Sequence, residues 1–272
     1  MHVPALPVYT AADAVRSLNS FEPRDFDAPL EVGDGIEATF LPAGHILGAA
    51  QIHINVDGHS IHFSGDLGRA DDPLMFPPRE LEAADILVTE STYGNRRHPD
   101  QDAAAELGAV VSRVAKRGGV VMIAAFAVGR AETLMLHLSR LRRKHLIPDI
   151  PIYLNSPMAI DASYMYRQHP DEHRLLVDEF EDMYKLATMS RTADDSKLLN
   201  LRGGPMVIIS ASGMLTGEGS STTLRLMAGS EKRHHPQRLP GRRNTRCRPG
   251  GRSKGTQDLR PGRPHSGRGR TN

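Results

Sequence analysis

Three strand-like segments in the first third of the chain each end at one ionisable side chain, which limits the folds open to the sequence. The segments GIEATFLPAGH, AQIHINVDGHSIHFSGD and ADILVTEST lead to His45, Asp66 and Glu90. The Asp-Gly pair within VDGHS predicts a hairpin turn inside the second segment. Ligand-binding side chains on layered sheets are commonly placed at strand ends. We therefore expect His45, Asp66 and Glu90 to gather at one edge of a sheet.

Each of these three residues also has a structural explanation when taken singly. A histidine such as His45 is more often a hydrogen-bonding residue than a ligand. Asp66 lies beside glycines, where an aspartate usually forms a turn. Glu90 closes the apolar run ILVTE, which we expect to be a buried strand, so its carboxylate needs a partner. The indication of a site comes from the three together.

The remaining body of the chain alternates helix-like and strand-like segments. Helical spacing or capping predicts helices over residues 8–19, 101–117, 158–168 and 171–187 and over GRAETLMLHLSRLRRKH, while GVVMIAA, IPIYLN and PMVIISASG read as strands. This alternation predicts an α/β fold class that begins with an antiparallel hairpin.

Composition excludes several classes of protein. The chain is 39% hydrophobic and 24% charged, without an apolar run of the roughly 18 residues that a membrane span needs. The first residues lack the basic and apolar regions of a secretory signal. The single cysteine, Cys247, excludes a disulfide framework and a cysteine-based zinc site. We expect a cytoplasmic protein with no membrane partner.

The charge is divided unevenly along the chain. Residues 231–272 contain 13 Lys/Arg against two Asp/Glu, whereas residues 1–230 contain 21 basic and 30 acidic residues. The basic end has three apolar residues in all, Leu239, Cys247 and Leu259, so we expect disorder there. Its composition fits either an RNA-binding arm or the translation of a shifted reading frame.

Taken in order, six stretches resemble the β-CASP branch of the metallo-β-lactamase fold, whose members are RNA-processing nucleases. They are GHILGAAQI, FSGDLGR, ILVTESTYGNRRH, GGVVMIAAFAVGRAE, IYLNSPMA and ISASGMLTG, and the resemblance spans roughly residues 6–230. It implies part of a metallo-β-lactamase αββα sandwich over residues 1–94, an inserted α/β β-CASP domain over 95–230, and a separate tail over 231–272.

The resemblance also implies residue roles. His45 matches a zinc ligand, Asp66 a catalytic aspartate that bridges two Zn²⁺ ions, and Glu90 a carboxylate that supports the catalytic site through hydrogen bonds. The FAVGRAE and SPMA stretches belong to the wall of an RNA cleft, which makes Ser156 a candidate RNA-binding residue. Arg130, at the start of a predicted helix, is a second candidate for an RNA phosphate, although a plain surface role explains it equally well.

The family's His-x-His-x-Asp-His signature does not occur in this sequence, and two later histidines are replaced by the basic tail. We therefore expect the chain to be the middle of a larger enzyme, with an out-of-frame end. His45 and Asp66 alone would bind zinc weakly, because a two-zinc centre needs several ligands for each ion. The expected function is zinc-dependent RNA cleavage by the complete enzyme, with little activity in this chain.

Two other functions stay open. A non-catalytic RNA-binding protein would use the basic tail, and a small-substrate hydrolase would share the fold. The ESTYG, FAVGRAE and SPMA stretches argue against the hydrolase because they belong to the nucleic-acid branch.

Two further histidine patterns are interpreted as structural. HPDEH, from His169 to His173, matches a zinc-protease pattern, but Pro170 separates the two histidines on a helix. His59 and His62 point to opposite faces of a strand, and we expect both at the surface.

Overall fold

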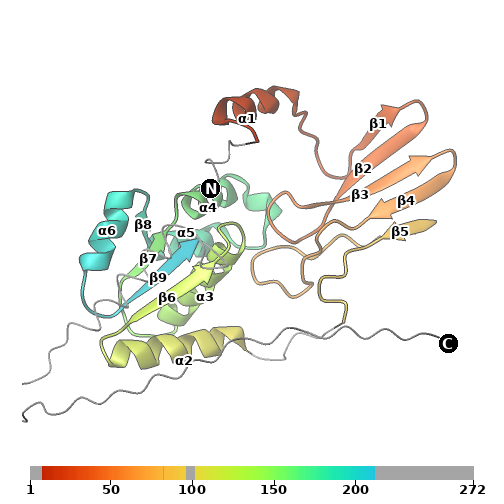
Figure 1. Cartoon of the computed structure of the whole chain (residues 1–272). Helices are drawn as coiled ribbons and strands as arrows, with labels where there is room; N and C mark the ends of the chain where they lie inside the picture. Colours follow the sequence, from red (N-terminus) through yellow and green to blue (C-terminus); the bar gives the residue numbers. More distant parts are fainter. Residues whose placement is uncertain (1–7, 82, 96–101, 212–272) are drawn as a thin grey trace, which may run out of the picture. The chain divides into compact units, whose positions relative to one another are not determined.

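The computed structural model describes residues 8–81, 83–95 and 102–211, and their strands form two separate sheets. The first sheet has the order β1-β2-β3-β4-β5, with its neighbours antiparallel except for the parallel pair β4 and β5 (Figure 1). Its strands are β1 (Pro29–Gly33), β2 (Ile36–Pro42), β3 (Ala50–Val56), β4 (His59–Phe63) and β5 (Ile86–Val88).

Asp-Gly turns set the register of this sheet. Asp57 and Gly58 both have positive φ, at +50° and +79°, as a two-residue hairpin turn between β3 and β4 requires. The predicted hairpin is therefore present. The same dipeptide at Asp34 and Gly35 joins β1 to β2, and Gly35 has a φ of +69°. Strand β1 was not among the predicted strands, although this turn signal precedes β2 in the sequence.

The two faces of the first sheet differ in polarity. The registered pairs place one set of apolar side chains on a single face: Leu30, Ala38, Phe40, Ile52, Ile54, Ile61, Phe63, Ile86 and Val88. The prediction that ILVTE is buried is wrong, because Ile86, Leu87 and Val88 are 54%, 58% and 48% exposed. Strand β5 lies at the sheet edge and pairs, within the described ranges, with β4 alone.

The opposite face buries a residue that sequence reasoning placed at the surface. His62 is only 1% exposed, so that expectation is wrong, whereas His59 on the other face is exposed as expected. His62 packs beside the buried Gln51, whose amide is bonded to the loop around Arg79. The prediction that His59 and His62 lie on opposite faces of β4 is confirmed, but the burial of His62 was not predicted.

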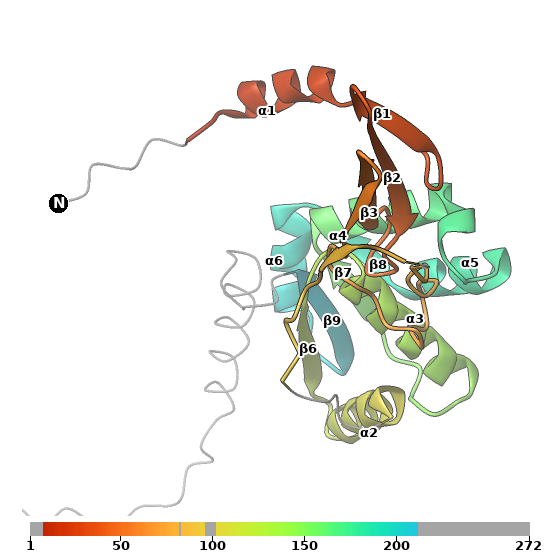
Figure 2. The same ribbon diagram turned by 90° about the vertical axis from the view of Figure 1, so that its right-hand side faces the viewer.

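The second sheet is entirely parallel and is covered on both faces. Its order is β6-β9-β7-β8, from β6 (Val120–Ala125), β7 (Ile152–Asn155), β8 (Thr188–Ser190) and β9 (Met206–Ala211). Figure 2 shows α3 on one side of β6 and β9 and α6 on the other. Leu154 and Ile209 pack in the larger core with the helices, while Tyr153 and Ile208 pack against Leu199 of α6. Burial on both faces explains the unbroken apolar runs of these strands.

Four of the six α-helices in the described ranges begin at side-chain caps that the sequence displays. They are α1 (Ala11–Ser17), η1 (Leu18–Ser20), α2 (Ala103–Lys116), α3 (Arg130–Arg143), α4 (Pro157–Gln168), η2 (Pro170–Glu172), α5 (Val177–Leu186) and α6 (Ala193–Leu201). The side chain of Thr10 caps α1 in a capping box with Asp13, as expected. Within the described ranges, no helix has both the length and the apolar character to cross a membrane.

The predicted helix over residues 171–187 is interrupted. A short η2 is followed by an extended segment, and α5 starts only at Val177. His173 forms a β-bridge with Met75, and the Arg174 N–H donates to the Leu74 carbonyl at 3.0 Å. These contacts use the backbone groups that a helix would need. The fold is thus mixed α/β, with an antiparallel and a parallel sheet, while the domain boundaries at residues 94 and 230 stay predictions.

Candidate functional site

The loops that carry His45 and Asp66 touch through their backbones. His45 follows β2 and Asp66 follows β4. The Gly68 N–H donates to the Ala43 carbonyl at 2.8 Å. A Cβ on Gly68 would lie 1.8 Å from the Gly44 carbonyl oxygen, a distance that no side chain tolerates. The two loops therefore approach each other as closely as a glycine permits.

Glu90 holds the backbone beside Asp66. One carboxylate oxygen accepts from the Leu67 N–H at 3.1 Å, and the other accepts from the Thr92 N–H at 3.2 Å. Hydrogen bonds from Thr92, then from Leu67, lower the pKa of Glu90, and the charge of nearby His45 adds to this effect. A carboxylate that accepts backbone N–H bonds stays ionised. Glu90 is thus placed to orient the Asp66 loop and to lie near His45.

The described residues do not form a complete metal centre. His45 and Asp66 are both exposed. Across the described ranges, no group of three or more His, Cys, Asp or Glu side chains is arranged to hold a metal ion. The metal-ligand roles of His45 and Asp66, and the catalytic roles of Asp66 and Glu90, therefore stay predictions.

The loop after His45 is fixed to helix α4. The Leu47 N–H donates to the hydroxyl of Tyr166 at 3.3 Å. Tyr166 is fully buried, and burial raises the pKa of its phenol, which keeps the hydroxyl neutral. At Gly129, which precedes α3, an added Cβ would lie 2.9 Å from Cγ2 of Ile46. The α3–α4 region thus sets the path of the His45 loop.

Replacing Tyr166 with phenylalanine is expected to loosen this loop. The substitution keeps the ring but removes the acceptor, which leaves the Leu47 N–H without its partner. We expect a loss of about 1 kcal/mol in the free energy of unfolding and faster hydrogen exchange at the Leu47 amide. The control is Tyr164→Phe, on an exposed ring of the same helix. Unchanged exchange at Leu47 in Tyr166→Phe would show that the bond does not hold the loop.

The HPDEH segment has a structural role. His173 is 3% exposed, and its Nε2–H donates to the Tyr166 carbonyl at 3.0 Å. Its Nδ1 accepts from the Leu175 N–H at 3.3 Å. Both ring nitrogens are occupied, so neither is left for a metal. His169 is exposed and lies at the end of α4, apart from the His173 ring.

The two predicted RNA-binding residues lie at helix starts but differ in exposure. Arg130 is the exposed first residue of α3. Ser156 is 5% exposed, and its hydroxyl accepts from the Ala159 N–H at 3.1 Å as the cap of α4. That hydroxyl is already engaged in the fold. Exposure therefore favours Arg130, and RNA contact by either residue stays a prediction.

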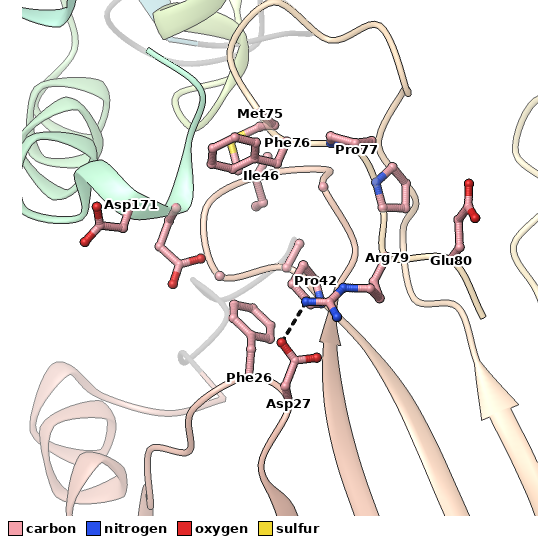
Figure 3. Close-up of a pocket in the computed structure, with 15 residues that line it drawn as sticks. Phe26, Asp27, Pro42, Ile46, Met75, Phe76, Pro77, Arg79, Glu80 and Asp171 are labelled. Carbon is pink, nitrogen blue, oxygen red and sulfur yellow. Dashed lines mark hydrogen bonds and ion pairs between the residues drawn. The ribbon is translucent and has the colours of Figure 1, made fainter. Parts of the chain in front are cut away.

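A pocket of about 710 Å³ lies against the His45 loop (Figure 3). Gly44, Ile46 and Gly48 of that loop contribute to its lining. Its charged lining residues are Asp27, Arg79, Glu80, Asp171 and Glu172. The guanidinium of Arg79 is paired with Asp27 at 2.8 Å, so the lining has an excess of carboxylates. Such a pocket repels phosphate, and an RNA backbone is not expected in it.

Comparison with known proteins identifies the class to which the chain belongs. Residues 131–234 match the family described as Beta-Casp domain. The chain is 30% identical over 218 residues to Ribonuclease TTHA0252 of Thermus thermophilus, covering 78% of this chain and 50% of that protein. It is 31% identical over 225 residues to Transcription termination factor FttA of Methanosarcina mazei, covering 77% and 35%.

A eukaryotic relative has a similar sequence identity and also matches most of this chain but a smaller part of its own length. Endoribonuclease ysh1 of Schizosaccharomyces pombe is 30% identical over 232 residues, covering 81% of this chain and 30% of that protein. The chain thus spans half the length, or less, of these relatives. Residues 131–234 thus carry a β-CASP domain, and the chain is a distant homologue of ribonucleases, at about 30% identity.

Proposed function

We propose that the chain is part of a zinc-dependent nuclease that hydrolyses RNA phosphodiester bonds. The observation that carries the proposal is the contact between the His45 and Asp66 loops, with Glu90 bonded beside Asp66, in a homologue of ribonucleases. His45 and Asp66 are the proposed metal ligands. Glu90 is proposed to fix the Asp66 loop rather than to bind metal.

The donor chemistry fits zinc, but the number of donors does not. Imidazole and carboxylate are both ordinary zinc ligands, and a zinc ion usually takes four ligands. The described ranges contain no cluster of three candidate donors. The sequence also contains no His-x-His-x-Asp-His string. No metal-dependent step follows from these residues alone, since a working centre would need donors beyond those described.

RNA binding is the part of the function that this chain can be expected to show by itself. Arg130 is exposed at the N-terminus of α3, where the helix dipole favours an anion. A phosphate contact here would be independent of base sequence. We propose that Arg130 positions the RNA backbone on the β-CASP domain.

Substituting Arg130 with alanine tests this assignment. We expect weaker RNA binding and a salt dependence whose log–log slope falls by about 1, as for the loss of one phosphate contact. The matched control is Arg113→Ala, on an exposed arginine within α2. If Arg130→Ala has no effect and truncation after residue 230 abolishes binding, the basic tail is the RNA-binding element and the proposal fails.

Metal-dependent cleavage is a separate expectation. The 272-residue chain should not cut a labelled RNA measurably faster with Zn²⁺ than with a chelator, because its described donors are too few. The measurement compares wild type and His45→Ala at matched zinc concentrations. Zinc-dependent cleavage that disappears in His45→Ala would show that the chain holds a working centre.

A further inference from the structure

Two histidines face each other across neighbouring strands of the first sheet. His53 on β3 and His62 on β4 are directly paired in register. Their ring centroids are 5.7 Å apart, with the ring planes tilted by 45°. His62 is buried and His53 is partly exposed. Neither residue belongs to the loops of His45 and Asp66.

The hydrogen bonds of Gln51 fix the tautomer of His62. The Gln51 side-chain NH₂ donates to the carbonyls of Pro42, at 3.1 Å, and Arg79, at 2.8 Å. The amide oxygen of Gln51 must then face His62 Nε2, 2.9 Å away. Because that oxygen can only accept, the proton of neutral His62 is on Nε2. Its Nδ1 therefore carries a lone pair.

That lone pair has no partner. The Nδ1 atoms of His53 and His62 are both buried, and neither has a hydrogen-bond partner among the described residues. A buried polar atom without a partner costs free energy and calls for an explanation. Neutral His53 with its proton on Nε2 presents a second lone pair. A histidine that donates one ring N–H to a fixed acceptor is the arrangement found in metal ligands.

The spacing of the two rings suits a shared ion. A zinc ion about 2.0–2.1 Å from one nitrogen of each ring, in tetrahedral geometry, places the two ring centroids about 5.2 Å apart. The observed 5.7 Å differs little from that value, and a small rotation of the partly exposed His53 closes the gap. We propose that His53 and His62 form a binding site for a divalent transition-metal ion on the polar face of the first sheet.

The ligand type narrows the choice of metal. Imidazole nitrogens suit Zn²⁺, Co²⁺, Ni²⁺ and Cu²⁺, whereas Mg²⁺ and Ca²⁺ prefer oxygen. Two histidines supply only two of the four ligands that a zinc ion usually takes, so we expect a modest affinity, with water in the remaining positions. Gln51 serves as the partner that orients the His62 ring.

Zinc titration of the full chain tests the site. The background variant His234→Ala/His235→Ala removes the adjacent histidine pair of the basic end, which is a competing site in the sequence. In this background we expect a Zn²⁺-binding event by calorimetry, and visible absorption bands when Co²⁺ replaces Zn²⁺. His53→Ala should weaken that event at least about tenfold, the lower bound for losing even an outer partner of a metal ligand. His53 is partly exposed, so this variant is expected to fold, which circular dichroism checks.

Two control variants separate this site from others. His59→Ala removes an exposed histidine of β4, the strand that carries His62. His45→Ala removes the proposed ligand of the catalytic metal. Both should retain the event that His53→Ala loses. Absence of zinc binding in the background variant, or equal binding after His53→Ala, would overturn the proposal and leave the two rings as a purely structural pair. Loss of the event in His45→Ala alone would also overturn it.

Discussion

Replacing Gly68 with alanine is expected to destabilise the chain by about 3 kcal/mol or more, the upper range for forcing extra atoms into a packed site. The new Cβ would meet the Gly44 carbonyl oxygen at 1.8 Å and the His45 nitrogen at 2.7 Å. Both obstacles are backbone atoms, so rotation of a side chain cannot relieve them. The His45 and Asp66 loops would have to separate, and the bond from Gly68 N–H to Ala43 would be lost.

Urea denaturation of wild type and variant measures this effect, with Gly203→Ala as the control. A Cβ on Gly203 meets nothing within 4 Å, and its backbone is not in the left-handed region. That control should lie within about 0.5 kcal/mol of wild type. Equal stability of Gly68→Ala and Gly203→Ala would mean that the two loops do not touch in solution.

Features encoded by a few adjacent residues were predictable from the sequence. The Asp57-Gly58 turn and the Thr10–Asp13 capping box carry their own conformational preference, and both are present. Two missed elements had comparable signals. Helix α6 is capped by Thr192 with Asp195 in a second capping box, and β1 leads into the Asp34-Gly35 turn. Both elements carry local signals of the same kind as the predicted turn and the predicted cap.

Features that depend on distant residues were not predictable from local pattern. The helix expected from residue 171 is broken because His173 and Arg174 pair with the chain near Met75. His62 is buried beside Gln51, whose side chain bonds to both His62 and the distant Arg79 carbonyl. Apolar composition predicted that β5 is buried, yet an edge strand is buried only where something lies against it.

The candidate site also combines features that local sequence predicts with features that depend on distant residues. Its three residues were predicted from their positions at strand ends, and their individual roles came from the resemblance to β-CASP nucleases. The bond from the Leu67 N–H to Glu90 shows that this carboxylate fixes the backbone next to Asp66, while its role in a catalytic site stays a prediction. The bond between Leu47 and Tyr166 joins residues 119 positions apart, and no local signal indicates it.

Replacing Glu132 with glutamine is expected to stabilise the protein above neutral pH. Glu132, in the first turn of α3, is fully buried and accepts a hydrogen bond from the Ser163 hydroxyl at 2.8 Å. Its second carboxylate oxygen has no partner among the described residues. Burial raises the pKa of Glu132 from 4.5 to about 7, because the ionised form loses its hydration.

The direction of the pH dependence follows from this raised pKa. Between pH 4.5 and about 7 the folded state binds the proton more tightly than the unfolded chain, so stability from this group falls as pH rises through that range. Below pH 4.5 the carboxyl is neutral in both states, and glutamine should change little. Above pH 7 the folded protein holds a buried charge that glutamine lacks, worth about 3 kcal/mol.

Denaturation of wild type and Glu132→Gln at acidic and alkaline pH measures this difference. The stability gap between the two proteins should be near zero at the acidic end and reach about 3 kcal/mol in favour of the variant at the alkaline end. The control, Glu106→Gln, changes an exposed glutamate in the first turn of α2 and should alter stability by less than about 1 kcal/mol at either pH. If the stability difference between wild type and Glu132→Gln does not vary with pH, Glu132 ionises in the folded protein as easily as in water.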